Sequence, residues 1–312
     1  SLEGNATAGV KTEKQKFIDN VKSNSIACGL NEILTYSFVS PRGVDKINLP
    51  ANDEKRNFVK IMNPLGEETS VMRTTLIPNM LDVISTNISH KVEEVSAFEC
   101  GNTFIPQEGL PIETKKYCVG MYGKEVDFFV LKGVIESVLN NVGLKGYEIE
   151  PETTNLTFHP GRCAKIVYNN IYIGTFGELH PDVIENYNLG QRVYVAEINI
   201  DTVFENLNLT KSYNPLPKYP STSRDIALIV KDEVFVKQIE DIIKANGEDL
   251  VESYKLFDVY KGAQIEEGHK SIAYSITYRS KDKTLTDEDV AKVHEKILSE
   301  LSEKLNANLR SN

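Results

Sequence analysis

The chain has 312 residues, of which 40% are hydrophobic and 26% charged, and its formal net charge is −10. This composition is typical of a folded protein with enough chain for two domains, and no apolar run is long enough for a membrane span. Acidic residues outnumber basic residues both before and after Tyr213, which excludes a nucleic-acid binder that relies on overall charge. The 4 cysteines form no Cys-x-x-Cys pair, so we expect reduced thiols in a cytosolic protein rather than disulfides or a zinc site.

The first part of the chain alternates helices and strands. Residues 1–11 are small and polar and are expected to be the remnant of a linker. Thr12 and Gln15 match a capping box, which predicts a helix that stops at Gly29, and Asp127 predicts the start of a second amphipathic helix. Short helices are predicted after 180 and at 201–207. The predicted strands are rich in apolar and β-branched residues and cover 32–39, 57–62, 95–104, 117–122, 164–168, 171–176 and 193–200.

The stretch from 63 to 104 contains the first candidate site. A turn at 63–66 is followed by Arg73 and then by a helix that Thr75 is predicted to cap. Glu99 lies in the next predicted strand, which could pack beside Arg73. The two side chains could hold an anionic ligand together or could simply pair with each other. Their spacing alone favours the pairing.

Residues 208–220 are predicted to separate two domains, because the segment is polar and then carries three prolines. The elements beyond it follow the order strand, helix, strand, strand, helix, strand. This βαββαβ order predicts a ferredoxin-like domain. The elements are expected at 225–230, 234–246, 250–260, 271–279, 287–305 and near Leu309, with Thr286 and Asp289 capping the last helix.

Two histidine motifs are further candidates for a metal or phosphate site in the first part of the chain. They are His159-Pro160-Gly161-Arg162 and Glu178-x-His180. A histidine beside a proline at the end of a strand more often satisfies loop backbone, so no metal site is predicted. No Walker A, dinucleotide-binding, zinc-protease or serine-hydrolase motif is present in the sequence.

The second domain offers a possible basic edge for RNA phosphates. The side chains that could form it are Arg224, Arg279, Lys281, Lys283 and Arg310. Tyr274 and Tyr278 alternate on one predicted strand and could face either a nucleobase or the core. Because the domain is net acidic, a surface role for each cation is at least as well supported.

Several stretches resemble one family, the beta (large) subunit of bacterial phenylalanine–tRNA ligase, a class II aminoacyl-tRNA synthetase. In the first part these are Gly29 to Phe38, Asn63-Pro64-Leu65, Phe98-Glu99-Cys100-Gly101, His159 to Arg162 and Gly177 to Pro181; in the second they are Tyr219-Pro220, Arg224-Asp225, Leu256 to Tyr260, Thr284 to Asp287 and Leu309-Arg310. The resemblance implies an α+β chain. A class II synthetase-like antiparallel sheet with flanking helices would span 12–207, a linker 208–217, and a ferredoxin-fold anticodon-binding domain 218–311.

The resemblance also implies that the first module has lost its chemistry. In an active class II site an arginine on a strand holds the ATP α-phosphate, whereas Phe98-Glu99-Cys100-Gly101 has none there, and the Gly-rich arginine motif is missing. No catalytic residue is therefore assigned to this chain. The family's editing module and its N-terminal RNA-binding domain are not in this sequence, so it resembles a fragment of a longer chain, with no metal site carried over.

The family assembles from two alpha and two beta subunits in the cytoplasm, and its alpha subunit charges tRNA(Phe) with phenylalanine using ATP and Mg²⁺. By this resemblance the basic residues of the second domain are candidates for tRNA binding. Structural or subunit-interface roles fall to Arg73, Glu99, His159, Arg162, Glu178 and His180. The alternative is a free-standing regulatory or interaction paralogue built on an inactive synthetase fold. Copurification of a small synthetase subunit or of a metabolic enzyme would separate the two readings.

Overall fold

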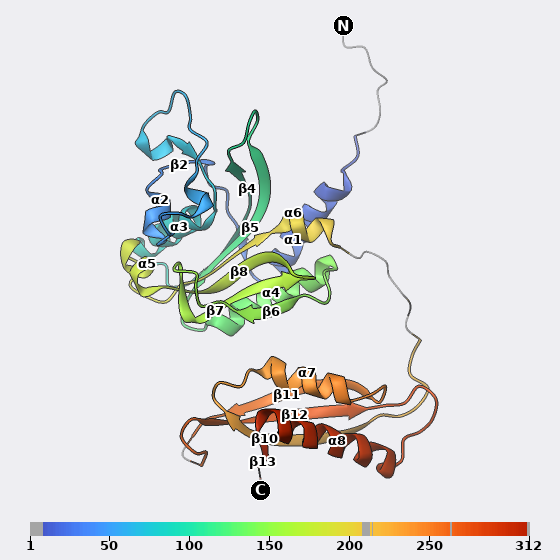
Figure 1. The fold of residues 1–312 in the computed structure, drawn as a ribbon. Coiled ribbons are helices and arrows are strands. Elements are labelled where there is room, and N and C mark those ends of the chain that lie inside the picture. The colour runs from blue at the N-terminus through green and yellow to red at the C-terminus, as the bar shows by residue number, and fades with distance from the viewer. Residues whose placement is uncertain (1–8, 208–212, 214, 263, 311–312) are drawn as a thin grey trace. The chain divides into compact units, whose positions relative to one another are not determined.

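The computed structural model describes residues 9–207, 213, 215–262 and 264–310. Two compact units divide the chain, Ser1–Thr210 and Lys211–Asn312 (Figure 1). The parts of the predicted linkers at 1–8, 208–212 and 214 lie outside the described residues. Within the described chain, no helix has the length and apolar character needed to cross a bilayer.

A seven-stranded sheet organises the first unit, in the order β1-β4-β5-β9-β8-β7-β6. Only β1 and β4 pair in parallel, and every other neighbouring pair is antiparallel. The last of these strands in the sequence, β9, lies in the middle and joins the hairpin β4–β5 to the hairpin β7–β8. The strands are β1 (Asn31–Glu32), β4 (Val95–Ile105), β5 (Ile112–Tyr122), β6 (Glu148–Pro151), β7 (Phe158–Tyr168), β8 (Ile171–Leu179) and β9 (Tyr194–Asn199).

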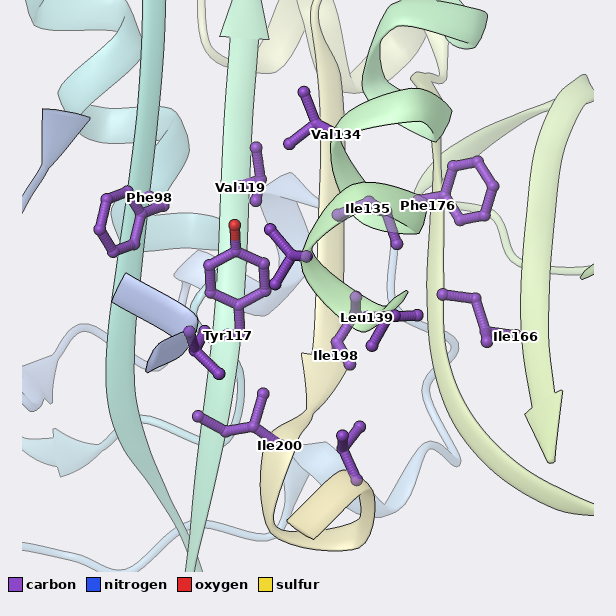
Figure 2. Packing of buried hydrophobic residues seen from close by; sticks show 14 of the residues in the cluster. Phe98, Tyr117, Val119, Val134, Ile135, Leu139, Ile166, Phe176, Ile198 and Ile200 are labelled. Carbon is purple, nitrogen blue, oxygen red and sulfur yellow. The ribbon is translucent and has the colours of Figure 1, made fainter. Parts of the chain in front are cut away.

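Helices cover both faces of this sheet, and each face has its own apolar core. α1 (Glu13–Ala27), α4 (Phe128–Val142) and α6 (Ile200–Glu205) contribute to one core, in which Ile135 and Leu139 of α4 lie against strand residues such as Val119 and Ile198 (Figure 2). On the other face lie α2 (Gly43–Lys46), α3 (Ile77–Ser89) and α5 (Pro181–Asn186). Burial on both faces explains why β9 reads as a nearly continuous apolar run.

Local signals predicted several element boundaries correctly. Thr12 and Gln15 make both hydrogen bonds of a capping box at the start of α1, and Asp127 accepts a hydrogen bond from the Val130 amide at the start of α4. Asn169 and Asn170 turn the hairpin β7–β8 with φ of 48° and 64°. Both values lie in the left-handed region that asparagine tolerates.

The strands predicted at 32–39 and 57–62 are wrong as continuous strands. In the first segment only β1 and β2 (Phe38–Val39) are strands. Between them the chain is no longer paired with β4 as a strand. β2 pairs instead with β3 (Val71–Met72) in a small separate sheet, and the second segment contributes a single bridge from Lys60. Leu34 and Tyr36 gave the first segment its strand-like pattern, yet each is 82% exposed and packs into neither core. Short 3-10 helices, η1 (Glu54–Arg56) and η2 (Glu67–Thr69), occupy nearby loops.

The second unit confirms the predicted βαββαβ order and, with the first, the α+β class. Its sheet has the order β11-β12-β10-β13, and α7 and α8 share one core with one side of that sheet. Tyr274 and Tyr278 are fully buried in this core, so neither faces a nucleobase. The elements are β10 (Thr222–Lys231), α7 (Val236–Asn246), β11 (Val251–Tyr260), β12 (His269–Tyr278), α8 (Asp287–Leu305) and β13 (Asn308–Leu309).

Candidate functional site

Arg73 and Glu99 form a buried ion pair beside the sheet of the first unit. The distance from Arg73 Nη1 to Glu99 Oε1 is 3.0 Å, and the two side chains are 4% and 2% exposed. Arg73 also donates from Nη1 to the Thr35 hydroxyl at 2.8 Å and from Nε to the Asn102 carbonyl at 2.9 Å. Thr35 donates in turn to Glu99 Oε2 at 2.7 Å. The guanidinium charge is therefore compensated inside the protein, and the pair presents no open grip for an anion.

Gly101 makes room for this pair. A Cβ atom at Gly101 would lie 2.3 Å from Arg73 Nη2 and 2.9 Å from Glu99 Oε1, closer than real Cβ contacts. A glycine inside a strand commonly marks such a close approach. The Phe98-Glu99-Cys100-Gly101 motif therefore supplies both the partner of Arg73 and the space that Arg73 occupies.

The predicted cap at Thr75 is confirmed only in part: the Thr75 hydroxyl accepts a hydrogen bond from the Ile77 amide at 3.3 Å, but a distant carboxylate also caps α3. Leu76 is the N-cap residue and makes no cap hydrogen bond with its own side chain. Glu197 Oε1 on β9 accepts hydrogen bonds from the Leu76 amide and from the Thr75 hydroxyl, both at 2.7 Å. Sequence reasoning missed Glu197, although a single acidic residue inside an apolar strand was the available signal.

The two histidine motifs meet where β7 and β8 pair. Phe158 is opposite Leu179 and Cys163 is opposite Gly177, so the intervening residues of β7 bulge. Arg162, at the end of this bulge, donates to Glu178 Oε1 at 2.8 Å, and the Glu178 side chain is 7% exposed. The two motifs thus form one structural contact across the hairpin.

Both histidines in these motifs serve local backbone. Nδ1 of His159 accepts a hydrogen bond from the Gly161 amide at 3.0 Å inside the bulge. The ring of His180 is the N-cap of α5 and accepts from the Asp182 amide at 3.2 Å. Across the described residues, no group of three or more His, Cys, Asp or Glu side chains is placed to hold a metal ion.

Most cations proposed for RNA contact in the second unit are paired with carboxylates. Arg224 lies 2.7 Å from Asp287, and Arg279 lies 3.0 Å from Glu252. Lys283 lies 2.8 Å from Asp289. The hydrogen bond from Lys283, followed by those from Thr286, lowers the pKa of Asp289 to about 2. Lys281 is exposed, and its ammonium group makes no ion pair with any described residue.

Arg310 lies apart from these residues. Its amide donates to the Ala227 carbonyl at 2.9 Å, and its guanidinium donates to Gln264 at 3.2 Å. The guanidinium carbon is 5.6 Å from the centre of the Tyr260 ring, a cation–π arrangement. Ala227 alternates with the core residues Ile226 and Leu228, so this contact lies on the sheet face away from α7 and α8. The proposed residues therefore do not form one continuous edge.

Comparison with solved structures defines the class of protein. Two structures of pyrrolysyl-tRNA synthetase from Desulfitobacterium hafniense match with TM-scores of 0.51 and 0.50, covering 62% and 61% of this chain and 68% and 67% of theirs. Sequence identity is 12% and 11%, so the likeness shows the fold alone. Residues 217–310 match the family described as the ferredoxin-fold anticodon-binding domain. The chain therefore combines a class II aminoacyl-tRNA synthetase fold with an anticodon-binding-type domain.

Sequence comparison then gives the family. Residues 2–200 match the family described as the phenylalanyl tRNA synthetase beta chain CLM domain. The phenylalanine–tRNA ligase beta subunits of Clostridium tetani and Moorella thermoacetica are 46% and 36% identical, over 96% and 99% of this chain. The chain belongs to the phenylalanyl-tRNA synthetase beta-chain family. It spans 38% and 40% of the length of these two relatives.

Proposed function

We propose that this chain is the non-catalytic, tRNA-binding part of a phenylalanine–tRNA ligase beta subunit. An alpha subunit would carry out the ATP-dependent charging of tRNA(Phe) with phenylalanine, in an assembly of two alpha and two beta subunits. The observation that carries the non-catalytic role is the engagement of Arg73 by Glu99, Thr35 and the Asn102 carbonyl inside the protein. Adenylate formation needs positive charge that can reach a phosphate as negative charge develops, and this guanidinium cannot.

ATP and Mg²⁺ belong to the assembled enzyme in this proposal. Across the described residues, no three carboxylate, histidine or cysteine side chains converge on a position for a metal ion. Arg162 is also engaged, since it donates to the buried Glu178. No catalytic step is therefore assigned to a residue of this chain. Its role is to support a neighbouring active site and to hold tRNA.

The test of the non-catalytic role is phenylalanine-dependent ATP–pyrophosphate exchange. The chain alone, supplied with phenylalanine, ATP and Mg²⁺, should exchange at the rate of a no-protein blank. The complete alpha and beta subunits from the same source serve as the positive control. Robust exchange by the isolated chain would overturn the proposal. Recovery of a small synthetase subunit with tagged chain from its own cells would support the proposed assembly.

We propose that the second unit contacts tRNA through two places. One is the Tyr260–Arg310 stack, where an aromatic ring and a guanidinium lie on the sheet face that the helices leave uncovered. Unpaired RNA bases commonly stack on aromatic rings and arginine planes. The other place comprises the phosphate-contact candidates at the start of α8 and after β12, namely Arg224, Arg279, Lys281 and Lys283.

Salt-dependent binding of tRNA(Phe) to the full chain tests both places. Lys281→Gln and Lys283→Gln should each lower the slope of log K against log salt by about 1 for a lost phosphate contact. Tyr260→Leu should weaken binding by about 1–3 kcal/mol without changing the slope, because stacking carries no charge. Lys244→Gln, an exposed lysine on α7, is the matched control. Binding that is unchanged in all three test variants would contradict the placement.

A further inference from the structure

β11 is a long sheet edge that no other strand covers within the described residues. It ends the four-stranded sheet of the second unit and pairs only with β12. The other edge strands are short: β1, β2, β3 and β13 have two residues each, and β6 has four and ends at Pro151. β11 has ten residues and no proline. Short strands and prolines keep sheet edges from pairing with other chains, and β11 has neither protection.

Apolar side chains lie exposed along this edge. Phe257 is 53% exposed and Val259 is 50% exposed. Tyr254 and Leu256 pack only partly against the core of the unit. A strand added outside β11 would cover these side chains and would hydrogen-bond to the outward-facing backbone groups. The edge therefore fits an extended protein segment.

A β-bulge decides which side chains of β11 share a face. Lys255 is opposite Ser275 on β12 and Asp258 is opposite Ala273, so three steps along β11 match two steps along β12. Phe257 is the extra residue. Ser275 and Ala273 are two positions apart and point to the same face, because side chains alternate along a strand. The bulge therefore places Lys255 and Asp258 on one face, whereas an uninterrupted strand would place them on opposite faces.

The sequence of β11 complements itself in the antiparallel direction. In one register of two copies, Lys255 of each copy lies opposite Asp258 of the other, and the twofold axis makes this pair occur twice. In the same register Tyr254 lies opposite Val259, an aromatic and β-branched pair that stabilises antiparallel strands. The members of each pair share a face of the sheet, as direct opposition requires. Lys255 and Asp258 are both exposed, and neither makes an ion pair with a described residue.

We propose that two copies of this chain associate through β11, edge to edge and antiparallel, about a twofold axis. The association joins their two four-stranded sheets into one continuous sheet. Both copies use the same patch, so the contact closes as a dimer and does not extend into a fibre. The opposed charges fix the register. The contact involves neither an alpha subunit nor tRNA, so it goes beyond the proposed function.

Sedimentation equilibrium of the full chain tests this association. The unmodified chain should form a dimer in a concentration-dependent way below roughly 0.5 mM, the range expected for a small transient interface. Lys255→Asp opposes two aspartates at both symmetry-related positions and should raise the dissociation constant about tenfold or more. Asp258→Lys opposes two lysines and should do the same. Lys292→Asp, at an exposed lysine on α8, is the matched control and should leave the constant unchanged.

A mixture of the two charge-reversed variants tests the register. Each variant alone opposes like charges, whereas one copy of each restores an aspartate opposite a lysine at both positions. The mixture should therefore associate as tightly as the unmodified chain, and this recovery would also show that both variants are folded. Three results would each overturn the proposal: an unmodified chain that stays monomeric at roughly 0.5 mM, a dissociation constant that neither reversal changes, or a mixture that binds no tighter than the single variants.

Discussion

Removing one member of the buried Arg73–Glu99 pair should destabilise the first unit more than replacing both. Glu99→Gln keeps the shape of the side chain but leaves the guanidinium of Arg73, 4% exposed, without its counter-charge. An uncompensated buried charge costs about 3–5 kcal/mol. The double replacement Arg73→Met with Glu99→Leu removes both charges and fills the space with apolar atoms, which is commonly close to neutral. It still leaves Thr35 and the Asn102 carbonyl without Arg73, but both residues are only partly buried, so water can replace part of the lost hydrogen bonding.

The cysteines allow unfolding of the first unit to be measured separately from unfolding of the second. Cys100, Cys118 and Cys163 are buried and Cys28 is partly buried, and all of them precede the second unit. Thiol labelling during urea unfolding of the full chain therefore reports on the first unit only. With a slope of about 2–3 kcal/mol per M, Glu99→Gln should lower the urea midpoint by roughly 1–2 M.

The double variant tests whether the cost of Glu99→Gln comes from the uncompensated charge of Arg73. If it does, the urea midpoint of the double variant should lie above that of Glu99→Gln, with an unchanged slope of unfolding free energy against urea. The comparison must be made at one pH and one salt concentration. Equal or lower stability of the double variant would refute the reasoning. In that case the geometry around Thr35, rather than charge compensation, would account for the cost.

Three further predictions concern a close approach, a cap and a titrating group. Gly101→Ala should lower the stability of the first unit by about 1–3 kcal/mol in thiol-detected unfolding, because its Cβ would displace Arg73; an unchanged midpoint would show that the pair shifts freely. Glu197→Ala should cost about 1–3 kcal/mol and speed amide exchange at Leu76, whereas Glu197→Gln keeps an acceptor and should cost less. Burial lowers the pKa of His294 below 6.5 in the folded protein. The unfolded chain then binds more protons, so stability of the second unit should fall as pH drops through 6.5 towards the folded pKa. His294→Gln should flatten this dependence in pH-resolved melting of the second unit, and a slope equal to that of the unmodified chain would exclude His294 as its source.

Features governed by nearby residues could be predicted from the sequence. The caps at Thr12, Asp127 and Thr286 depend on residues within one helical turn, and the structure contains all three. The asparagine turn at 169–170 and the βαββαβ order are local in the same sense. In each case the residue that decides the conformation and the residue that responds are close in the chain.

Features governed by distant partners could not be predicted in this way. Thr75 has the right side chain for a cap and accepts from the Ile77 amide, but the Leu76 amide is bound by Glu197, on a strand much later in the chain. The spacing favours the pairing of Arg73 with Glu99, whereas no local pattern indicates Thr35 as the third member of the group. Charge alone places Arg310 with the other cations, although its contact with Tyr260 depends on how β13 adds to the sheet.

The central position of β9 has a consequence for how the first unit is made. During synthesis the hairpins β4–β5 and β7–β8 emerge first and can form from local contacts, but neither can join the other without the strand that follows them. The carboxylate that caps α3 arrives on that same strand. Until β9 leaves the ribosome, both hairpins carry an unpaired edge and exposed apolar faces, which is the condition in which chains aggregate or recruit chaperones. The sheet of this unit can therefore be completed only after Tyr194–Asn199 has been synthesised.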